Sequence, residues 1–168
     1  MPTDCRCAGV PHSLGIIHRH LRPSKVLLNP QADARVPLAK VTGFGLEYLV
    51  ERQTWWDFMS TSPQLPYSAP ELLDKLPEKH DTQCSDVYAL GVVWAFTLTG
   101  TEPFAHLKPA HKYRLRALQE AVMVGRRMEP VVPNAPALLD KCRAYDPSDR
   151  PSSMQVLLAL PLPVASSM

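Results

Sequence analysis

The chain has 168 residues, a length that fits one domain, and 45% of them are hydrophobic, so a core can form. Its 18 basic and 16 acidic side chains leave a net charge of +2. That balance argues against binding to nucleic acid or to a charged membrane surface. The 18 prolines are spread along the chain, so they indicate loops rather than a disordered tract.

The four cysteines stand at positions 5, 7, 84 and 142, and this spacing does not match a zinc site. We therefore expect reduced thiols and no metal. The sequence opens without the pattern of a signal peptide, and the apolar stretch from Val87 to Leu98 is too short to span a bilayer. These features predict a cytoplasmic protein.

Taken in chain order, residues 1–13 are polar and irregular. Short apolar runs at 26–28 and 36–41 then predict a small hairpin-like region, with Pro37 favouring an edge strand. Four helices are predicted after it, at 86–99, 112–124, 137–143 and from Ser152 to a stop at Pro161.

Two of these helices carry clear end signals. Gly100 ends the first, and Ser152 with Gln155 forms a possible capping box for the last. The first helix is apolar on all faces, which predicts a place in the centre of the domain. The expected fold class is mainly α (α+β), with a helical body and a short β-hairpin.

Five short motifs appear in a fixed order. They are His18-Arg19-His20-Leu21-Arg22-Pro23-Ser24-Lys25-Val26-Leu27-Leu28, Lys40-Val41-Thr42-Gly43-Phe44-Gly45, Tyr67-Ser68-Ala69-Pro70-Glu71, the run 86–94, and the run 146–152. Together they resemble the C-terminal lobe of a protein kinase. The resemblance implies three segments: an irregular segment 1–13, a kinase-like domain 14–160 and a tail 161–168.

The resemblance also indicates a type of kinase. Pro23, two residues before Lys25, resembles the serine/threonine pattern, and the spacing from Gly125 through Cys142 to Asp146 resembles the tyrosine-kinase-like group.

Four residues with structural roles in the family are present. The resemblance implies a buried ion pair between Glu71 and Arg150, and hydrogen bonds from the backbone of the catalytic loop to Asp86. It implies that Arg19 can pair with a phosphorylated activation segment.

The residues that carry chemistry in the family are replaced. His20 stands in place of the catalytic aspartate, and Lys25 and Gly43 stand in place of the two magnesium ligands. Arg22 replaces a lysine, and Gln64 replaces a threonine that braces the loop. The resemblance therefore implies a degenerate catalytic site, with no intact catalytic residue and no cofactor or metal site.

The motif of the phosphate-binding glycine loop is not in the sequence, so we expect the N-terminal lobe to be absent. The helix that precedes the catalytic loop in the family is expected to be truncated. Its loss is expected to expose Leu90, Val93 and Trp94 and to leave the chain marginally stable.

Three functional hypotheses follow. The first is a catalytically inactive, truncated kinase-like domain, a pseudokinase that serves as a protein-interaction or regulatory module in signalling. The second is a fragment or relative of an active serine/threonine kinase, and only this one brings ATP and magnesium. The third is a scaffold that binds another kinase through Trp55-Trp56, the helix 112–124 and the exposed helix face. No nucleic acid or membrane partner is expected.

Overall fold

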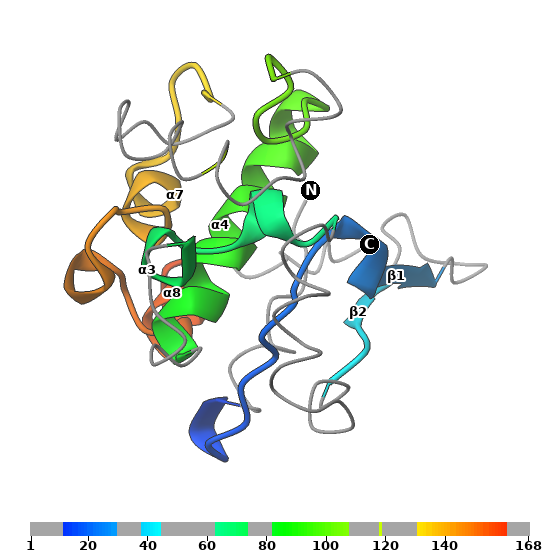
Figure 1. The fold of residues 1–168 in the computed structure, drawn as a ribbon. Coiled ribbons are helices and arrows are strands. Elements are labelled where there is room, and N and C mark those ends of the chain that lie inside the picture. Colours follow the sequence, from blue (N-terminus) through cyan, green and yellow to red (C-terminus); the bar gives the residue numbers. More distant parts are fainter. Residues whose placement is uncertain are drawn as a thin grey trace, which may run out of the picture.

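The computed structural model describes residues 12–29, 38–44, 63–73, 82–107, 118 and 131–160 (Figure 1). Its elements are, in chain order, the 3-10 helix η1 (Pro23–Lys25), strands β1 (Val26–Asn29) and β2 (Leu38–Val41), the 3-10 helix η3 (Leu65–Tyr67), helices α3 (Pro70–Leu73), α4 (Gln83–Thr99) and α7 (Ala137–Cys142), the 3-10 helix η4 (Pro147–Asp149) and helix α8 (Ser153–Ala159). The described residues thus form a helical body with a two-stranded sheet, which agrees with the expected class.

Helix α4 is the longest described element, and both of its ends are set by local chemistry. The Thr82 side chain accepts a hydrogen bond from the backbone of Ser85, and the Ser85 side chain accepts one from the backbone of Thr82. At the other end Gly100 takes a left-handed conformation, with φ 66°, and closes the last turn onto Phe96. The predicted end of this helix is confirmed. The predicted start at Asp86 is wrong, because the Thr82 cap lets polar residues form the first turn.

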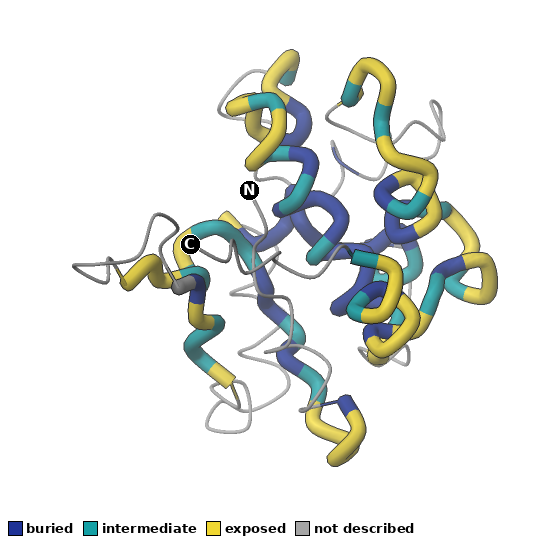
Figure 2. Tube along the Cα trace, turned by 180° about the vertical axis from the view of Figure 1, so that it is seen from behind, coloured by how far each residue is buried: buried dark blue, intermediate teal, exposed yellow. Residues whose placement is uncertain are grey.

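Burial places α4 in the centre of the molecule, with α3, α7 and α8 on one side and the hairpin on the other (Figures 1 and 2). One face joins a core cluster made by Leu21, Tyr67, Ala69, Tyr88, Ala89, Val92 and Val93. Another face places Val87 against Cys142 and Val156 of the C-terminal helices. Because both faces are buried, packing outweighs the weak helix propensity of the β-branched residues in α4.

The contact between α4 and α7 depends on a glycine. A β-carbon on Gly91 would lie 2.7 Å from Cγ of Arg143 and 3.0 Å from Cβ of Cys142. Arg143 is only 2% exposed, so its side chain has little room to move. The absence of a side chain at Gly91 therefore allows the two helices to approach closely.

The two strands form an antiparallel hairpin in which Val26 pairs with Val41 and Asn29 pairs with Leu38. Val26 and Val41 pack against the main core, whereas Leu27 is 57% exposed. The hairpin-like region is thus present. Its second strand begins at Leu38, after Pro37, rather than at 36.

The C-terminal helices follow the predicted pattern. Helix α7 ends at Cys142, one residue before the predicted end, and Ser152 caps α8 by the expected exchange of hydrogen bonds with Gln155. Of the predicted helix 112–124 the structure describes Leu118, which is buried against Leu65, Leu73 and Phe104. The rest of that helix, Trp55-Trp56 and the stop at Pro161 lie outside the described residues.

The prediction of an exposed α4 face is wrong. Val93 is 9% exposed because it packs in the main core, and Leu90 and Trp94 are half-buried. Leu90 contacts both the main core and the cluster around Val87. Within the described ranges, no helix is long and apolar enough to cross a bilayer.

Candidate functional site

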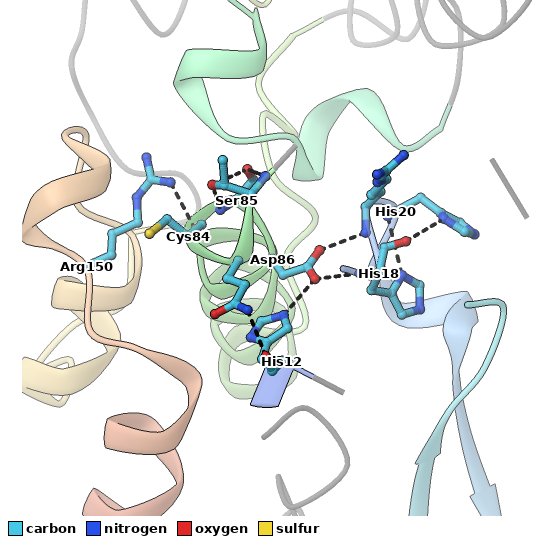
Figure 3. A network of polar contacts seen from close by, with 10 residues as sticks. His12, His18, His20, Cys84, Ser85, Asp86 and Arg150 are labelled. Carbon is cyan, nitrogen blue, oxygen red and sulfur yellow. Dashed lines mark hydrogen bonds and ion pairs between the residues drawn. The ribbon is translucent and has the colours of Figure 1, made fainter. Parts of the chain in front are cut away.

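The first turn of α4 fixes the backbone of the loop that carries His18, Arg19 and His20. The amides of His18 and Arg19 donate to the two carboxylate oxygens of Asp86, at 2.6 and 2.8 Å. Nε2 of His12 lies 2.9 Å from Oδ2 of the same carboxylate (Figure 3). Asp86 thus joins three donors from a segment almost 70 residues away, including the backbone contacts that the resemblance implies.

His12 was not selected from the sequence, where no carboxylate stands near it at ligand spacing. Its ring is 8% exposed, and its carbonyl accepts a hydrogen bond of 2.8 Å from the side chain of Gln83. The partners of His12 are more than 70 residues distant, so only the folded chain could reveal this contact.

The ring of His18 connects the loop to the end of β2. Its Nε2 lies 3.0 Å from the carbonyl of Thr42, and Nδ1 accepts from the amide of His20 at 3.4 Å. A carbonyl only accepts, so Nε2 carries the proton and the imidazole is neutral. The ring also meets that of Phe44 edge-on, with centroids 4.6 Å apart.

Arg19, between the two histidines, has φ 71°, a left-handed conformation that is uncommon for a residue with a side chain. The hydrogen bond from its amide to Asp86 helps to hold it there. The predicted pairing of Arg19 with a phosphorylated segment stays a prediction.

His20 is 8% exposed, and its Nδ1 lies 3.1 Å from the carbonyl of His18. By the same argument Nδ1 carries the proton, which leaves Nε2 as the unprotonated nitrogen. Burial, followed by the nearby charges of His18 and Lys25, lowers the pKa of His20 to about 4. The imidazole is therefore neutral at pH 7.

Lys25 and Gly43, which are distant in the sequence, meet beside this ring. A β-carbon on Gly43 would lie 3.3 Å from both Cδ and Nζ of Lys25, and 3.4 Å from Nε2 of His20. Gly43 itself has φ 86°, in the region that favours glycine. The space beside Gly43 is thus bordered by an ammonium group and an imidazole nitrogen.

A magnesium ion does not fit this arrangement. Magnesium prefers carboxylate and other oxygen ligands, whereas Gly43 offers no side-chain oxygen and Lys25 brings a positive charge. Across the part of the chain that the structure describes, no three histidine, cysteine or acidic residues gather as a metal site.

Gln64 contacts the loop from the side of η3. Its Nε2 donates to the carbonyl of Leu21 at 3.3 Å, and its side chain is 3% exposed. Gln64 thus braces the loop through Leu21 at the position where the resemblance implies a threonine.

Arg150 lies on the other side of the start of α4 (Figure 3). Both terminal nitrogens donate to the Glu71 carboxylate at 2.7 Å, so the ion pair implied by the resemblance is present and bidentate. The remaining donors reach three backbone carbonyls, those of Cys84, Ala144 and Tyr145. The guanidinium also lies 5.0 Å from the centre of the Tyr88 ring.

These features belong to a family that comparison identifies. The model of the protein kinase domain matches residues 9–160, so the chain belongs to the protein kinase domain family. The match begins five residues before the start of the domain expected from the motifs, at residue 14.

Individual relatives are serine/threonine and dual-specificity kinases. The chain is 32% identical over 148 residues to the serine/threonine-protein kinase H1 homolog of Pinctada fucata, covering 87% of this chain and 34% of that protein. It is 32% identical over 150 residues to the dual specificity protein kinase shkC of Dictyostelium discoideum, with 86% and 27% covered. With the ovarian-specific serine/threonine-protein kinase Lok of Drosophila melanogaster, identity is 31% over 159 residues, with 91% and 31% covered. The chain thus spans about a third of the length of these relatives.

Proposed function

We propose that this chain is a catalytically inactive kinase-like domain whose matched residues correspond to the C-terminal lobe. It serves as a protein-interaction or regulatory module in cytoplasmic signalling. The proposal separates the fold, which the family match supports, from phosphoryl transfer, which depends on a few side chains.

One observation carries the proposal: the Lys25 ammonium lies beside Gly43, at the two positions that correspond to the magnesium ligands. Phosphoryl transfer depends on metal ions that bridge the phosphates and offset their developing charge. An ammonium at this position repels a divalent cation and offers donors in place of acceptors.

His20 does not compensate for that loss. A neutral imidazole can act as a general base, and such a base contributes about 10²–10⁴-fold to a rate. A base alone supplies neither the metal nor the alignment of the phosphates. The change from aspartate to histidine is therefore secondary to the changes at Lys25 and Gly43.

A phosphotransfer assay tests the inactivity. The full chain is incubated with radiolabelled ATP, magnesium or manganese, and general protein substrates, beside an active serine/threonine kinase as positive control. We expect no transfer above that of a sample without protein. Metal-dependent transfer that disappears in His20→Ala would overturn the proposal in favour of an active kinase.

A matched pair of variants tests the physical reason. The double variant Lys25→Asn/Gly43→Asp restores two oxygen-bearing side chains, and we expect it to gain magnesium affinity, measured by calorimetry, that the wild-type chain lacks. Equal magnesium affinity of the two chains would show that the ammonium does not exclude the metal.

The interaction role has its own test. Co-purification of the full chain should yield a stoichiometric protein complex, whose composition is then determined by mass spectrometry and light scattering. A chain that remains alone under these conditions would argue against this part of the proposal.

A further inference from the structure

Positive charge gathers where the family binds a metal. We call this region the cationic corner and define it by His20, Arg22, Lys25 and Gly43. Lys25 directs its ammonium to the space beside Gly43, facing Nε2 of His20. Arg22 begins the η1 turn that Lys25 ends, and its charge also acts on His20.

Backbone hydrogen bonds hold the corner in place. The amide of Lys25 donates to the carbonyl of Arg22 at 2.8 Å, and the amide of Thr42 donates to the carbonyl of Lys25 at 2.9 Å. The hydroxyl of Thr42 reaches the same carbonyl at 3.3 Å. Two segments, at η1 and at the end of β2, are thus fixed next to each other before any ligand binds.

The carboxylates nearest in the network are already engaged. Asp86 accepts from two backbone amides and from His12, and Glu71 forms a bidentate pair with Arg150. The side-chain charges that act on His20 come from His18, Lys25 and Arg22, and all of these are positive when ionised. The corner therefore has a surplus of positive charge.

The surroundings of Lys25 suit an anion. The side chain is half-buried, so its ammonium is partly desolvated yet remains accessible. An ammonium supplies three donors and binds phosphate as a point charge, and a guanidinium adds donors in a planar fork. Gly43 places no side chain between a ligand and the ammonium.

We propose that the cationic corner binds a phosphate group, without a metal, through Lys25 and Arg22. The inference rests on the proposed function, since it requires that the corner no longer holds magnesium. It reverses the charge of the ligand that this part of the fold receives. The recognised chemistry is a phosphate dianion, supplied by inorganic phosphate, a nucleotide or a phosphorylated side chain.

Calorimetric titration of the full chain tests the proposal, with inorganic phosphate as the probe, EDTA present and ionic strength held constant with chloride. We expect saturable binding that Lys25→Gln weakens by about tenfold or more, because a charge-assisted contact is lost. Lys40→Gln is the matched control, since Lys40 is an exposed lysine three residues before Gly43. It should change the affinity by less than about twofold.

A second variant keeps the test decisive. Gly43→Asp places a carboxylate next to the Lys25 ammonium, and aspartate tolerates a positive φ better than most residues. We expect it to reduce phosphate binding as strongly as Lys25→Gln while its circular dichroism matches the wild type. If Gly43→Asp does not fold, Lys25→Gln and Lys40→Gln still decide the outcome.

Further titrations with pyrophosphate, metal-free ATP and phosphoserine identify the source of the phosphate, the tightest being assigned. Two results would overturn the proposal: phosphate affinity that is equal in wild type and Lys25→Gln, or binding that requires magnesium. Neither result bears on phosphotransfer, whose assay tests the proposed function separately.

Discussion

Two polar regions flank the start of α4, and they differ in how their charges are satisfied. Around Arg150, all five N–H donors of the guanidinium have acceptors, among them both oxygens of Glu71. In the cationic corner, Lys25 and Arg22 add positive charge near the neutral ring of His20. One region is electrostatically complete, whereas the other holds a surplus of one sign.

The difference shows which groups the fold depends on. The side chain of Arg150 is 0% exposed, so loss of its partner would leave a charge in the interior. Lys25 is half-buried and Gly43 has no side chain, so replacements there do not strand a charge. Residues needed for phosphoryl transfer can therefore change while the bonds that hold the helices together remain.

Breaking the Arg150 region should produce the largest effect. Glu71→Ala leaves the buried guanidinium without its carboxylate, and we expect a loss of about 3–5 kcal/mol in the free energy of unfolding. Denaturant titration of the wild-type and variant chains measures it. Lys141→Ala, on the exposed side of α7, is the control and should change stability by less than about 0.5 kcal/mol. A loss below about 1 kcal/mol for Glu71→Ala would place this pair with weak surface ion pairs.

Asp86 connects the stable interior to the loop, and its replacement should have a smaller effect. Asp86→Asn removes the charge and turns one acceptor into a donor that faces the amides of His18 or Arg19. We expect a loss of about 2 kcal/mol, since hydrogen bonds to charged groups contribute about 1.5–3 kcal/mol.

Amide exchange gives the more specific measurement for Asp86→Asn. The amides of His18 and Arg19 should lose protection, while those in the middle of α4 keep theirs relative to global stability. Asp149→Asn, at an exposed acidic residue, serves as control. Unchanged protection at His18 and Arg19 would contradict the role of Asp86 as the anchor of the loop.

Local signals in the sequence predicted much of the fold. Gly100 marks the end of α4 and Ser152 with Gln155 marks the start of α8, because these residues act on backbone groups within one turn. The start of α4 was missed because Thr82 and Ser85 form the same box without an acidic residue. The burial of Val93 depends on Leu21 and Tyr67, so no pattern within α4 could show it.

The candidate site divides in the same way. The motifs identified His20, Lys25 and Gly43 as replacements, since each stands at a fixed place in a short motif. They did not indicate that the Lys25 ammonium reaches the space beside Gly43, which depends on how η1 and β2 are placed. The contact of His12 with Asp86 joins segments 74 residues apart and required the fold as well.

The smallest expected effect concerns protons at His20. Its pKa is lowered from 6.5 to about 4 in the folded chain, so the unfolded chain binds the proton more readily between these values. Stability from this group is therefore fully present above pH 6.5 and decreases as the pH falls toward 4. Denaturant titrations at a series of pH values should show a shallower decrease for His20→Gln than for the wild type.

The same titration links the two regions by a direct measurement. Lys25→Gln removes one of the positive charges that oppose protonation, so the pKa of His20, followed by NMR, should rise from its wild-type value. Burial should still keep it below 6.5, because desolvation is the largest cause. An identical His20 pKa in wild type and Lys25→Gln would mean that the ammonium does not act on the ring. In that case the cationic corner would not be a single electrostatic unit, and its contrast with the paired Arg150 region would rest on Arg22 and His18 alone.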